Sequence, residues 1–207
     1  MPDLPQSVID RVSRLLSQGQ RALLGVAGAP GSGKSTLAMA IQARFPNDTQ
    51  VVPMDGFHLA NVELARLGRA HRKGAADTFD AAGYLNLLIR IKTQRADEVI
   101  YAPEFDRGLE EPIAGAIAIQ AHTPLLITEG NYLLLEDLPW CNARQLFDEA
   151  WFVDVDDQLR RERLVQRHIH FGRNTEEALH WVETTDEPNA RRIQQTQHLA
   201  DWTLSWS

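Results

Sequence analysis

The chain contains 207 residues, of which 43% are hydrophobic and 24% are charged. This length suffices to bury a core, so a single domain over residues 1–207 is expected. Lysine and arginine total 21 against 28 aspartate and glutamate, which gives a formal net charge of −7. This acidic balance argues against a nucleic-acid backbone or an anionic membrane surface as the main partner.

The cysteine content and the hydrophobic pattern indicate the cellular compartment in which the protein is expected. Cys141 is the only cysteine of the sequence, so an internal disulfide bond is excluded and a reducing intracellular compartment is favoured. Residues 1–20 lack an apolar block behind a basic start, and no segment approaches the ~20 apolar residues that span a bilayer. We therefore expect a cytoplasmic protein that does not enter a membrane.

The N-terminal segment alternates helices and strands. Residues 7–17 place apolar side chains on one helical face, and residues 22–27 form an apolar run of strand length. A glycine-rich turn leads into a second predicted helix at 35–45, and a breaker at 46–48 precedes a second strand at 50–54. Together these elements predict a β-α-β unit.

The same alternation continues along the rest of the chain. Helices are predicted at residues 61–67, 80–93 with Asp80 as its cap, 156–170, 175–184 and 188–199, and strands at 98–102, 116–120, 125–128, 150–155 and 201–206. Strands that alternate with helices predict an α/β fold with a parallel sheet covered on both faces. The charged segment at about 157–185 is expected to form a lid or surface layer.

One segment carries a specific motif. Residues 28–35 match G-x-x-x-x-G-K-[ST] between a predicted strand and a predicted helix, which is the context this motif requires. The glycines let backbone amides converge on phosphate oxygens, and the helix N-terminus adds a positive dipole. Lys34 supplies a charge for the β- and γ-phosphates, and Ser35 supplies a hydroxyl ligand for Mg²⁺. The predicted nucleotide-binding residues are Gly28, Ala29, Pro30, Gly31, Ser32, Gly33, Lys34, Ser35 and Thr36, with a purely structural glycine turn as the alternative.

Two carboxylates come at the ends of predicted strands. Asp55 follows the second strand, and Glu129 follows the apolar run 125–127. Because ligands of open α/β sheets bind at the carboxyl edge, Asp55 is placed to accept the proton of an attacking hydroxyl. Glu129 is a candidate to fix Mg²⁺ opposite Ser35. The alternative for both carboxylates is that they cap turns.

Three arginines share one face of the predicted helix 156–170. Arg160, Arg163 and Arg167 are spaced i, i+3 and i+7. Such a face can close over a transferring phosphate and neutralise its developing charge. A solvated face paired with acidic neighbours is the alternative and weighs equally for Arg160, so Arg163 and Arg167 are the predicted catalytic arginines.

Two segments beyond Asp55 have the composition of an acceptor site. Residues 66–80 are basic and interrupted by glycine, and residues 101–107 mix aromatic and charged side chains at a predicted strand end. An anionic or polyhydroxyl substrate needs cationic clamps and an aromatic wall. The predicted substrate-binding residues are His58, Arg72, Lys73, Tyr101, Phe105, Asp106, Arg107 and Asn131, with solvated loops, turn formation or structural hydrogen bonds as alternatives. The five tryptophans are assigned to packing.

These motifs resemble those of the P-loop kinases that include uridine kinase, phosphoribulokinase and bacterial-type pantothenate kinase. The chain is similar in particular to short bacterial members named nucleoside/nucleotide kinase family proteins or fructose transport system kinases. Gly56-Phe57-His58 replaces the Ser-Phe-Tyr typical of uridine kinases, and the chain is short for a pantothenate kinase. The matching segments are 28–36, 54–58, 72–74, 78–80, 101–103, 105–107 and 129–132.

The resemblance implies a three-layer P-loop fold with a central, mostly parallel five-stranded sheet and a small helical lid. It implies Asp55 as catalytic base, Lys34 as phosphate lysine and Arg163 or Arg167 as lid arginine. It also implies ATP and Mg²⁺ as cofactors, with Ser35 and Glu129 as the metal partners. Related kinases are often dimers, so the resemblance is compatible with a homodimer.

The sequence thus predicts an ATP- and Mg²⁺-dependent kinase that phosphorylates a hydroxyl of a small metabolite. The expected acceptor is a sugar or a sugar-like compound, including a fructose-related one, with a nucleoside, pantothenate or a phosphosugar as alternatives. From another class, a regulatory protein that hydrolyses ATP slowly without an acceptor is also compatible with the motif. A pocket facing Lys34 would favour the kinase over the regulator.

Overall fold

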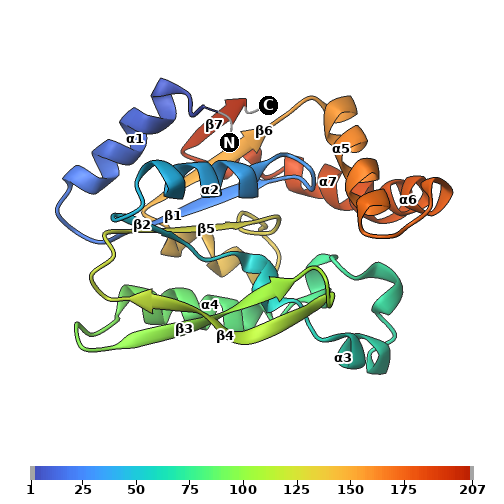
Figure 1. Ribbon diagram of the computed structural model, residues 1–207, viewed down its shortest axis with the longest axis horizontal. Helices are drawn as coiled ribbons and strands as arrows, with labels where there is room; N and C mark the ends of the chain where they lie inside the picture. The colour runs from blue at the N-terminus through green and yellow to red at the C-terminus, as the bar shows by residue number, and fades with distance from the viewer. Residues whose placement is uncertain (1–2, 206–207) are drawn as a thin grey trace.

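A parallel sheet of five strands forms the centre of the protein, in the order β2-β5-β1-β6-β7. The computed structural model describes residues 3–205. All residues of β1 and of β5 are buried, as expected of strands covered on both faces. The predicted α/β class with a five-stranded parallel sheet is therefore confirmed (Figure 1). The strands are β1 (Ala22–Gly28), β2 (Thr49–Val51), β5 (Leu125–Gly130), β6 (Glu149–Asp154) and β7 (Trp202–Ser205).

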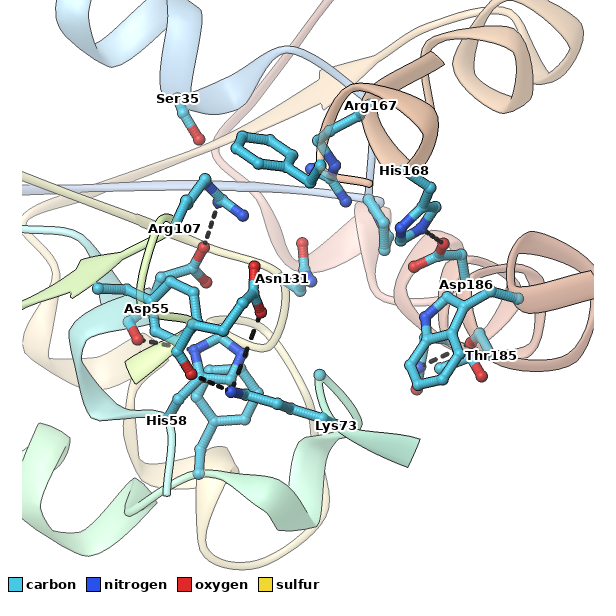
Figure 2. Close-up of a pocket in the computed structure, with 18 of the residues that line it drawn as sticks. Ser35, Asp55, His58, Lys73, Arg107, Asn131, Arg167, His168, Thr185 and Asp186 are labelled. Atoms are coloured by element: carbon cyan, nitrogen blue, oxygen red, sulfur yellow. Dashed lines mark hydrogen bonds and ion pairs between the residues drawn. The ribbon is translucent and has the colours of Figure 1, made fainter. Parts of the chain in front are cut away.

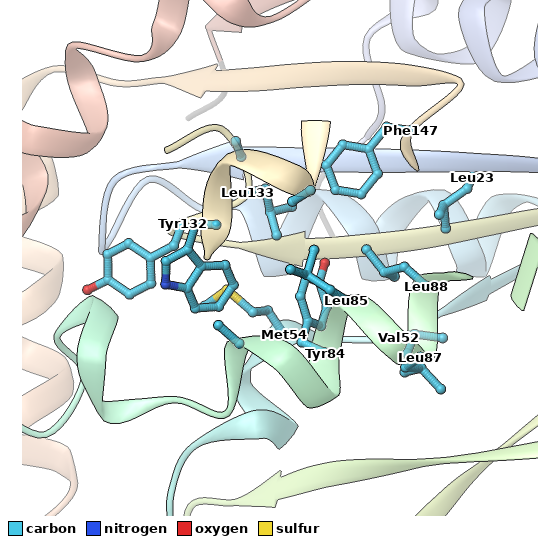
Figure 3. Packing of buried hydrophobic residues seen from close by; sticks show 14 of the residues in the cluster. Leu23, Val52, Met54, Tyr84, Leu85, Leu87, Leu88, Tyr132, Leu133 and Phe147 are labelled. Carbon is cyan, nitrogen blue, oxygen red and sulfur yellow. The ribbon is translucent and has the colours of Figure 1, made fainter. Parts of the chain in front are cut away.

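Helices cover both faces of this sheet (Figure 1). On one face, α1 (Gln6–Ser17) and α2 (Lys34–Arg44) pack against the outward side chains of the strands, in one buried apolar cluster. On the other face, α4 (Ala81–Lys92) packs its apolar side chains against Leu23 and Met54, in a second cluster (Figure 3). Asp80 caps α4 as predicted, because its carboxylate accepts a hydrogen bond from the Gly83 amide. The two clusters hold the three layers together.

The strands β3 (Val99–Asp106) and β4 (Glu111–Gln120) lie outside the central sheet. They pair with each other as an antiparallel hairpin, so the prediction that the alternating strands build one parallel sheet was wrong for these two. The physical reason is the short connection between them, which permits a hairpin, whereas a parallel partner needs a long crossover. The inner face of the hairpin joins the cluster around α4 through Ile100, Ala102 and Ile119.

A group of helices stands at one end of the sheet (Figure 1). It comprises α5 (Asp157–His170), α6 (Thr175–Trp181), a π-helical turn (Val182–Asp186) and α7 (Glu187–Gln194). The Asp156 carboxylate accepts hydrogen bonds from two amides of the first turn of α5, so this helix begins where the sequence predicted. The predicted helices 175–184 and 188–199 are shorter than expected, since the π-helical turn replaces the end of the first and α7 ends at Gln194, before a 3₁₀ turn (Gln197–Leu199). A further short helix, α3 (Asn61–Arg66), follows the predicted segment closely.

The second and last strands differ from their predicted bounds. β2 ends at Val51, and Asp55 lies in a 3₁₀ turn (Met54–Phe57) instead of at a strand end. The ladder stops because Pro53 has no amide hydrogen, after the Val52 amide has donated to the Ile127 carbonyl at 2.8 Å. Trp206, predicted in the last strand, lies outside the described residues. None of the helices within residues 3–205 is long and apolar enough to cross a membrane.

The turn that carries Asp55 fits tightly against the hairpin at Gly56. A methyl group on Gly56 would collide with the Pro103 carbonyl oxygen of β3. We expect Gly56→Ala to lower the free energy of unfolding by about 1–3 kcal/mol, because backbone atoms cannot move aside as a side chain can. Thermal unfolding followed by circular dichroism measures this change. Gly108→Ala is the matched control, since its methyl would come no closer than 3.2 Å to the Asp106 carboxylate; an equal effect of both variants would contradict the argument.

Candidate active site

The glycine-rich loop connects β1 to α2 at the carboxyl edge of the sheet. Gly31 and Gly33 have φ angles of 81° and 88°, in the left-handed region that glycine adopts without strain. Gly33 directly precedes α2, so the amides of this turn and the helix N-terminus point to the same space. The loop also packs closely on α5, because a methyl on Gly31 would lie 2.8 Å from the Arg160 carbonyl oxygen. The segment 28–36 thus has the conformation of an anion-binding loop.

A cavity of about 420 Å³ opens in front of this loop (Figure 2). Pro30, Lys34 and Ser35 form the wall of the cavity at the glycine-rich loop. The remaining wall comes from elements far apart in sequence: Asp55, His58, Ala70, Lys73, Gly74, Phe79, Phe105, Arg107, Glu110, Asn131, Arg167, His168, Phe171, Arg173, Trp181, Thr185, Asp186 and Asn189. The cavity therefore joins the glycine-rich loop, the 3₁₀ turn, the hairpin and the C-terminal helices.

Ser35 and Glu129 meet beside the loop. Ser35 Oγ lies 2.9 Å from Glu129 Oε1, in hydrogen-bond contact. Burial raises the pKa of Glu129, while the charge of Lys34 and the hydroxyl of Ser35 oppose that rise. A hydroxyl and a carboxylate are both hard oxygen ligands, so the pair fits Mg²⁺. Within residues 3–205 no cluster of three or more His, Cys, Asp or Glu side chains could hold a metal, so further ligands would come from phosphate and water.

Lys34 lies near two carboxylates in this site. Burial lowers the pKa of the Lys34 ammonium, and the negative charges of Glu129 and Asp55 counteract this shift. A desolvated cation in this position interacts strongly with an anionic ligand, because little water screens its charge. The arrangement suits the phosphate-binding role expected of this lysine.

Asp55 is ion-paired with the hairpin. Its Oδ2 lies 3.0 Å from Arg107 Nη2. Burial acts to raise the pKa of the Asp55 carboxyl, but the surrounding positive charge outweighs burial and holds this pKa below its usual range. The groups that lower it are His58, Arg107, Lys34 and Arg167. Asp55 is therefore an ionised hydrogen-bond acceptor at neutral pH, the state that the predicted proton acceptor needs.

His58 presents a defined face to the cavity. Its Nδ1 lies 2.7 Å from the Asp55 carbonyl oxygen, which can only accept, so Nδ1 carries the hydrogen. The ring lies between Phe79 and Phe105, with centroid distances of 4.0 and 4.5 Å. Burial lowers the pKa of His58, although Asp55 opposes this shift, so Nε2 is a hydrogen-bond acceptor in the neutral ring.

Three predicted substrate residues lie outside the cavity. Arg72 Nη1 is paired with Asp77 Oδ1 at 2.6 Å, and Tyr101 is 61% exposed on the outer side of the hairpin. The Asp106 carboxylate accepts hydrogen bonds from two amides of the hairpin turn, at 2.8 and 2.9 Å. Since Tyr101 lies within β3, its expected position at a strand end was wrong. Of the predicted set, the structure brings His58, Lys73, Phe105, Arg107 and Asn131 to the cavity.

The three arginines of α5 have different surroundings. Arg160 is 1% exposed and forms ion pairs with Asp157 and Glu187, so it links α5 to α7. Arg163 does not line the cavity, whereas Arg167 does (Figure 2). No hydrogen bond or ion pair engages the Arg167 guanidinium within residues 3–205, although Asp186 and Asp55 contribute favourable charge. Arg167 is therefore the arginine of this helix that faces the site.

Several cavity residues were missed by sequence reasoning. Trp181, assigned to packing, lines the cavity, and the Arg173 guanidinium stacks on its ring at 3.7 Å from the centroid. His168 and Asp186 form an ion pair with Nε2 to Oδ2 at 2.8 Å. Position was the one available signal for His168, Arg173 and Trp181, which fall within the segment 157–185 that was expected to form a lid, whereas Asp186 follows directly after that segment. The π-helical turn that brings Asp186 to the cavity has no sequence signature.

The glycine-rich loop, the parallel sheet and the paired Ser35 and Glu129 define the class of P-loop nucleotide-binding proteins. No family model matches the chain. It is 35% identical over 206 residues to a Schizosaccharomyces pombe protein named "Putative uridine kinase C227.14", covering 94% of this chain and 87% of that protein. It is 34% identical over 138 residues to the pantothenate kinase of Mycolicibacterium vanbaalenii, covering 64% of this chain and 43% of that enzyme.

A solved structure extends this similarity. The crystal structure of a "putative fructose transport system kinase" from Silicibacter sp. TM1040 superposes with a TM-score of 0.80 at 39% identity, covering 89% of this chain and 90% of that chain. The protein belongs to the P-loop small-molecule kinases of the uridine kinase, phosphoribulokinase and bacterial pantothenate kinase group. The resemblance inferred from the motifs is thereby confirmed.

The ion pair between Arg107 and Asp55 generates a prediction about pH. Because the Arg107 charge lowers the pKa of Asp55, we expect Arg107→Gln to raise that pKa and to move the loss of ionised Asp55 to higher pH. A carboxyl-¹³C NMR titration of both proteins measures this directly. Arg95→Gln, which removes a surface ion pair with Asp97, serves as the control. An unchanged or lowered Asp55 pKa in Arg107→Gln would rule out this electrostatic account.

Proposed function

We propose that this protein transfers the γ-phosphoryl group of ATP to a hydroxyl of a small metabolite in the cytoplasm. The observation that supports this most directly is the single cavity that contains Lys34 and Ser35 at one side and Asp55 at another. A phosphoryl donor and a hydroxyl acceptor need to meet in one enclosed space, away from water. An ATPase without an acceptor would not need the aromatic and charged wall beyond Asp55.

The donor side of the proposal depends on the glycine-rich loop. Residues 28–36 would cradle the triphosphate, and Lys34 would bind its β- and γ-oxygens. Ser35 and Glu129 would hold Mg²⁺ through its ligands or its waters. When bound, the metal supplies positive charge to the β- and γ-phosphates.

The acceptor side depends on Asp55. Its Oδ2 accepts from Arg107, which leaves Oδ1 to accept a hydrogen bond from the acceptor hydroxyl and to take its proton. Arg167 would neutralise the charge on the transferring phosphoryl group, since it faces the cavity from α5. We propose that residues 157–185 form a lid over this site and that residues 1–207 act as one kinase domain.

The acceptor we propose is a sugar or a sugar-like compound. The similarity to the protein named for fructose transport supports this class, while the relatives named for uridine and for pantothenate make nucleosides and pantothenate the competing acceptors. The neutral His58 Nε2, close to Asp55, is suited to accept a hydrogen bond from a second hydroxyl. A panel of sugars, sugar phosphates, nucleosides and pantothenate, assayed by ADP release with the product confirmed by mass, tests the proposal.

Substitution of the proposed base separates catalysis from nucleotide binding. We expect Asp55→Asn to lower kcat by about 10²–10³-fold, because a positioned base contributes this much to proton transfer. The Kd for ATP, measured by calorimetry, should change by less than about threefold, a small shift in binding free energy. Asp106→Asn, a carboxylate in the hairpin turn outside the cavity, is the control. Parallel losses of turnover and of ATP affinity would contradict the role given to Asp55.

Substitution of Lys34 in the glycine-rich loop should weaken ATP binding and turnover together. Lys34→Ala removes a desolvated cation beside the phosphate site, so we expect weaker ATP binding and slower turnover. Calorimetry with ATP and the ADP-release assay measure the two effects. Lys92→Ala, which removes an exposed pair with Asp148, is the control. If Lys34→Ala changed neither quantity, the glycine-rich loop would not be the nucleotide site.

A further inference from the structure

Asp186 is a buried carboxylate that faces the cavity and that the proposed phosphoryl transfer does not use. The residue is 8% exposed and lies at the end of the π-helical turn. Its Oδ2 accepts a hydrogen bond from His168 Nε2 at 2.8 Å. Within residues 3–205 no hydrogen bond to its other oxygen, Oδ1, is present. Oδ1 of Asp186 can therefore accept a hydrogen bond from a ligand, while the His168 ring holds the carboxylate in place.

Asn131 stands between Asp186 and the proposed base. In the view of Figure 2 the labelled side chains of Asp55, Asn131 and Asp186 follow one another across the cavity. Asn131 Oδ1 is buried and has no hydrogen-bond partner within the described chain. Buried polar groups nearly always have a partner, so an unpaired amide in a cavity wall indicates a site for a polar ligand. Two acceptor oxygens without a partner, one of Asn131 and one of Asp186, thus follow Asp55 across the cavity.

The positive charges of the cavity wall either have partners within the protein or belong to the proposed phosphate site. Lys73 Nζ donates to Asn61 Oδ1 at 2.8 Å and to the Glu110 carbonyl, and Arg107 pairs with Asp55. The Arg173 guanidinium stacks on Trp181. Arg167 and Lys34 remain, and both belong to the proposed phosphate site. The far side of the cavity therefore offers a carboxylate and an amide and no uncommitted cation for an anionic acceptor.

We propose that Asp186, positioned by His168, binds a hydroxyl of the acceptor, and that the acceptor is a neutral polyhydroxyl compound. One hydroxyl would lie at Asp55 and a more distant hydroxyl would donate to Asp186. A carboxylate or a phosphate ester on the acceptor would be repelled by Asp186. This inference rests on the proposed kinase function and narrows its substrate class.

The first experiment compares acceptors that differ only in charge. Initial rates of ADP release at saturating Mg-ATP are measured for glycerol against D-glycerate, D-ribose against D-ribonate, and D-fructose against D-fructose 6-phosphate, with D-glucosamine as the cationic probe. We expect the neutral member of a productive pair to have the higher kcat/KM, by about tenfold or more. A preference for the anionic member or for D-glucosamine would overturn the proposal.

The second experiment changes the carboxylate. We expect Asp186→Asn to raise the KM for the neutral acceptor by about tenfold more than the KM for ATP, and to reduce the discrimination against its anionic partner. Asp137→Asn is the matched control, because its carboxylate pairs with Arg192 outside the cavity. Unaltered acceptor KM and unaltered discrimination in a folded Asp186→Asn protein would overturn the role of Asp186.

The acceptor KM and kcat of a His168 variant distinguish a positioning role from a structural one. His168→Gln should raise the acceptor KM with a smaller effect on kcat, whereas loss of a merely structural residue would lower the apparent kcat through loss of folded protein and leave KM unchanged. Circular dichroism confirms folding of each variant, and the wild-type comparison of acceptors stands even if Asp186→Asn does not fold. If no acceptor of any charge accelerates ADP release, the proposed kinase function fails and this inference fails with it. If acceptors accelerate ADP release but the neutral ones are not preferred, only this inference fails.

Discussion

The parallel pairing of β1 with β5 is the constraint on which the site depends. Its register places Val26 opposite Glu129 and Ala27 opposite Gly130, so both strands end at one edge of the sheet. The chain leaves β1 into the glycine-rich loop at the level where Glu129 is fixed, and Ser35 meets that carboxylate at 2.9 Å. A shift of one residue would turn Glu129 to the other face of the sheet and would break this contact.

Burial makes the pKa values of the charged groups in the site depend strongly on one another. Lys34, Glu129 and Asp55 lie close together with little water around them, so each strongly influences the ionisation of the others. Burial raises the pKa of Glu129, while Asp55, which also faces Arg107, has its pKa lowered. Two neighbouring carboxylates thereby acquire different protonation behaviour, because Asp55 faces more positive charge than Glu129 does.

The acceptor side is built by two elements that are distant in sequence. The hairpin brings Phe105 and Arg107 against the turn that carries Asp55, with Gly56 packed on the Pro103 carbonyl. From the opposite side, the helices α5 and α6 supply Arg167, His168 and Trp181. Arg160, buried between α5 and α7, fixes this helical group close to the glycine-rich loop. The cavity exists only because both elements pack around the same sheet edge.

The sequence alone determined the β-α-β unit, the loop 28–36 and the pair of carboxylates Asp55 and Glu129, because these follow from local periodicity and short-range geometry. Only the tertiary structure decided that Phe105 faces the cavity while Tyr101 faces outward, since a register shift between Ala102 and Glu104 interrupts the simple alternation of β3. It also decided that Arg167 faces the site, that Arg160 is a buried structural residue, and that Asp186 joins the cavity wall. These outcomes depend on long-range packing, in which the neighbours of each side chain come from distant segments that no local pattern encodes.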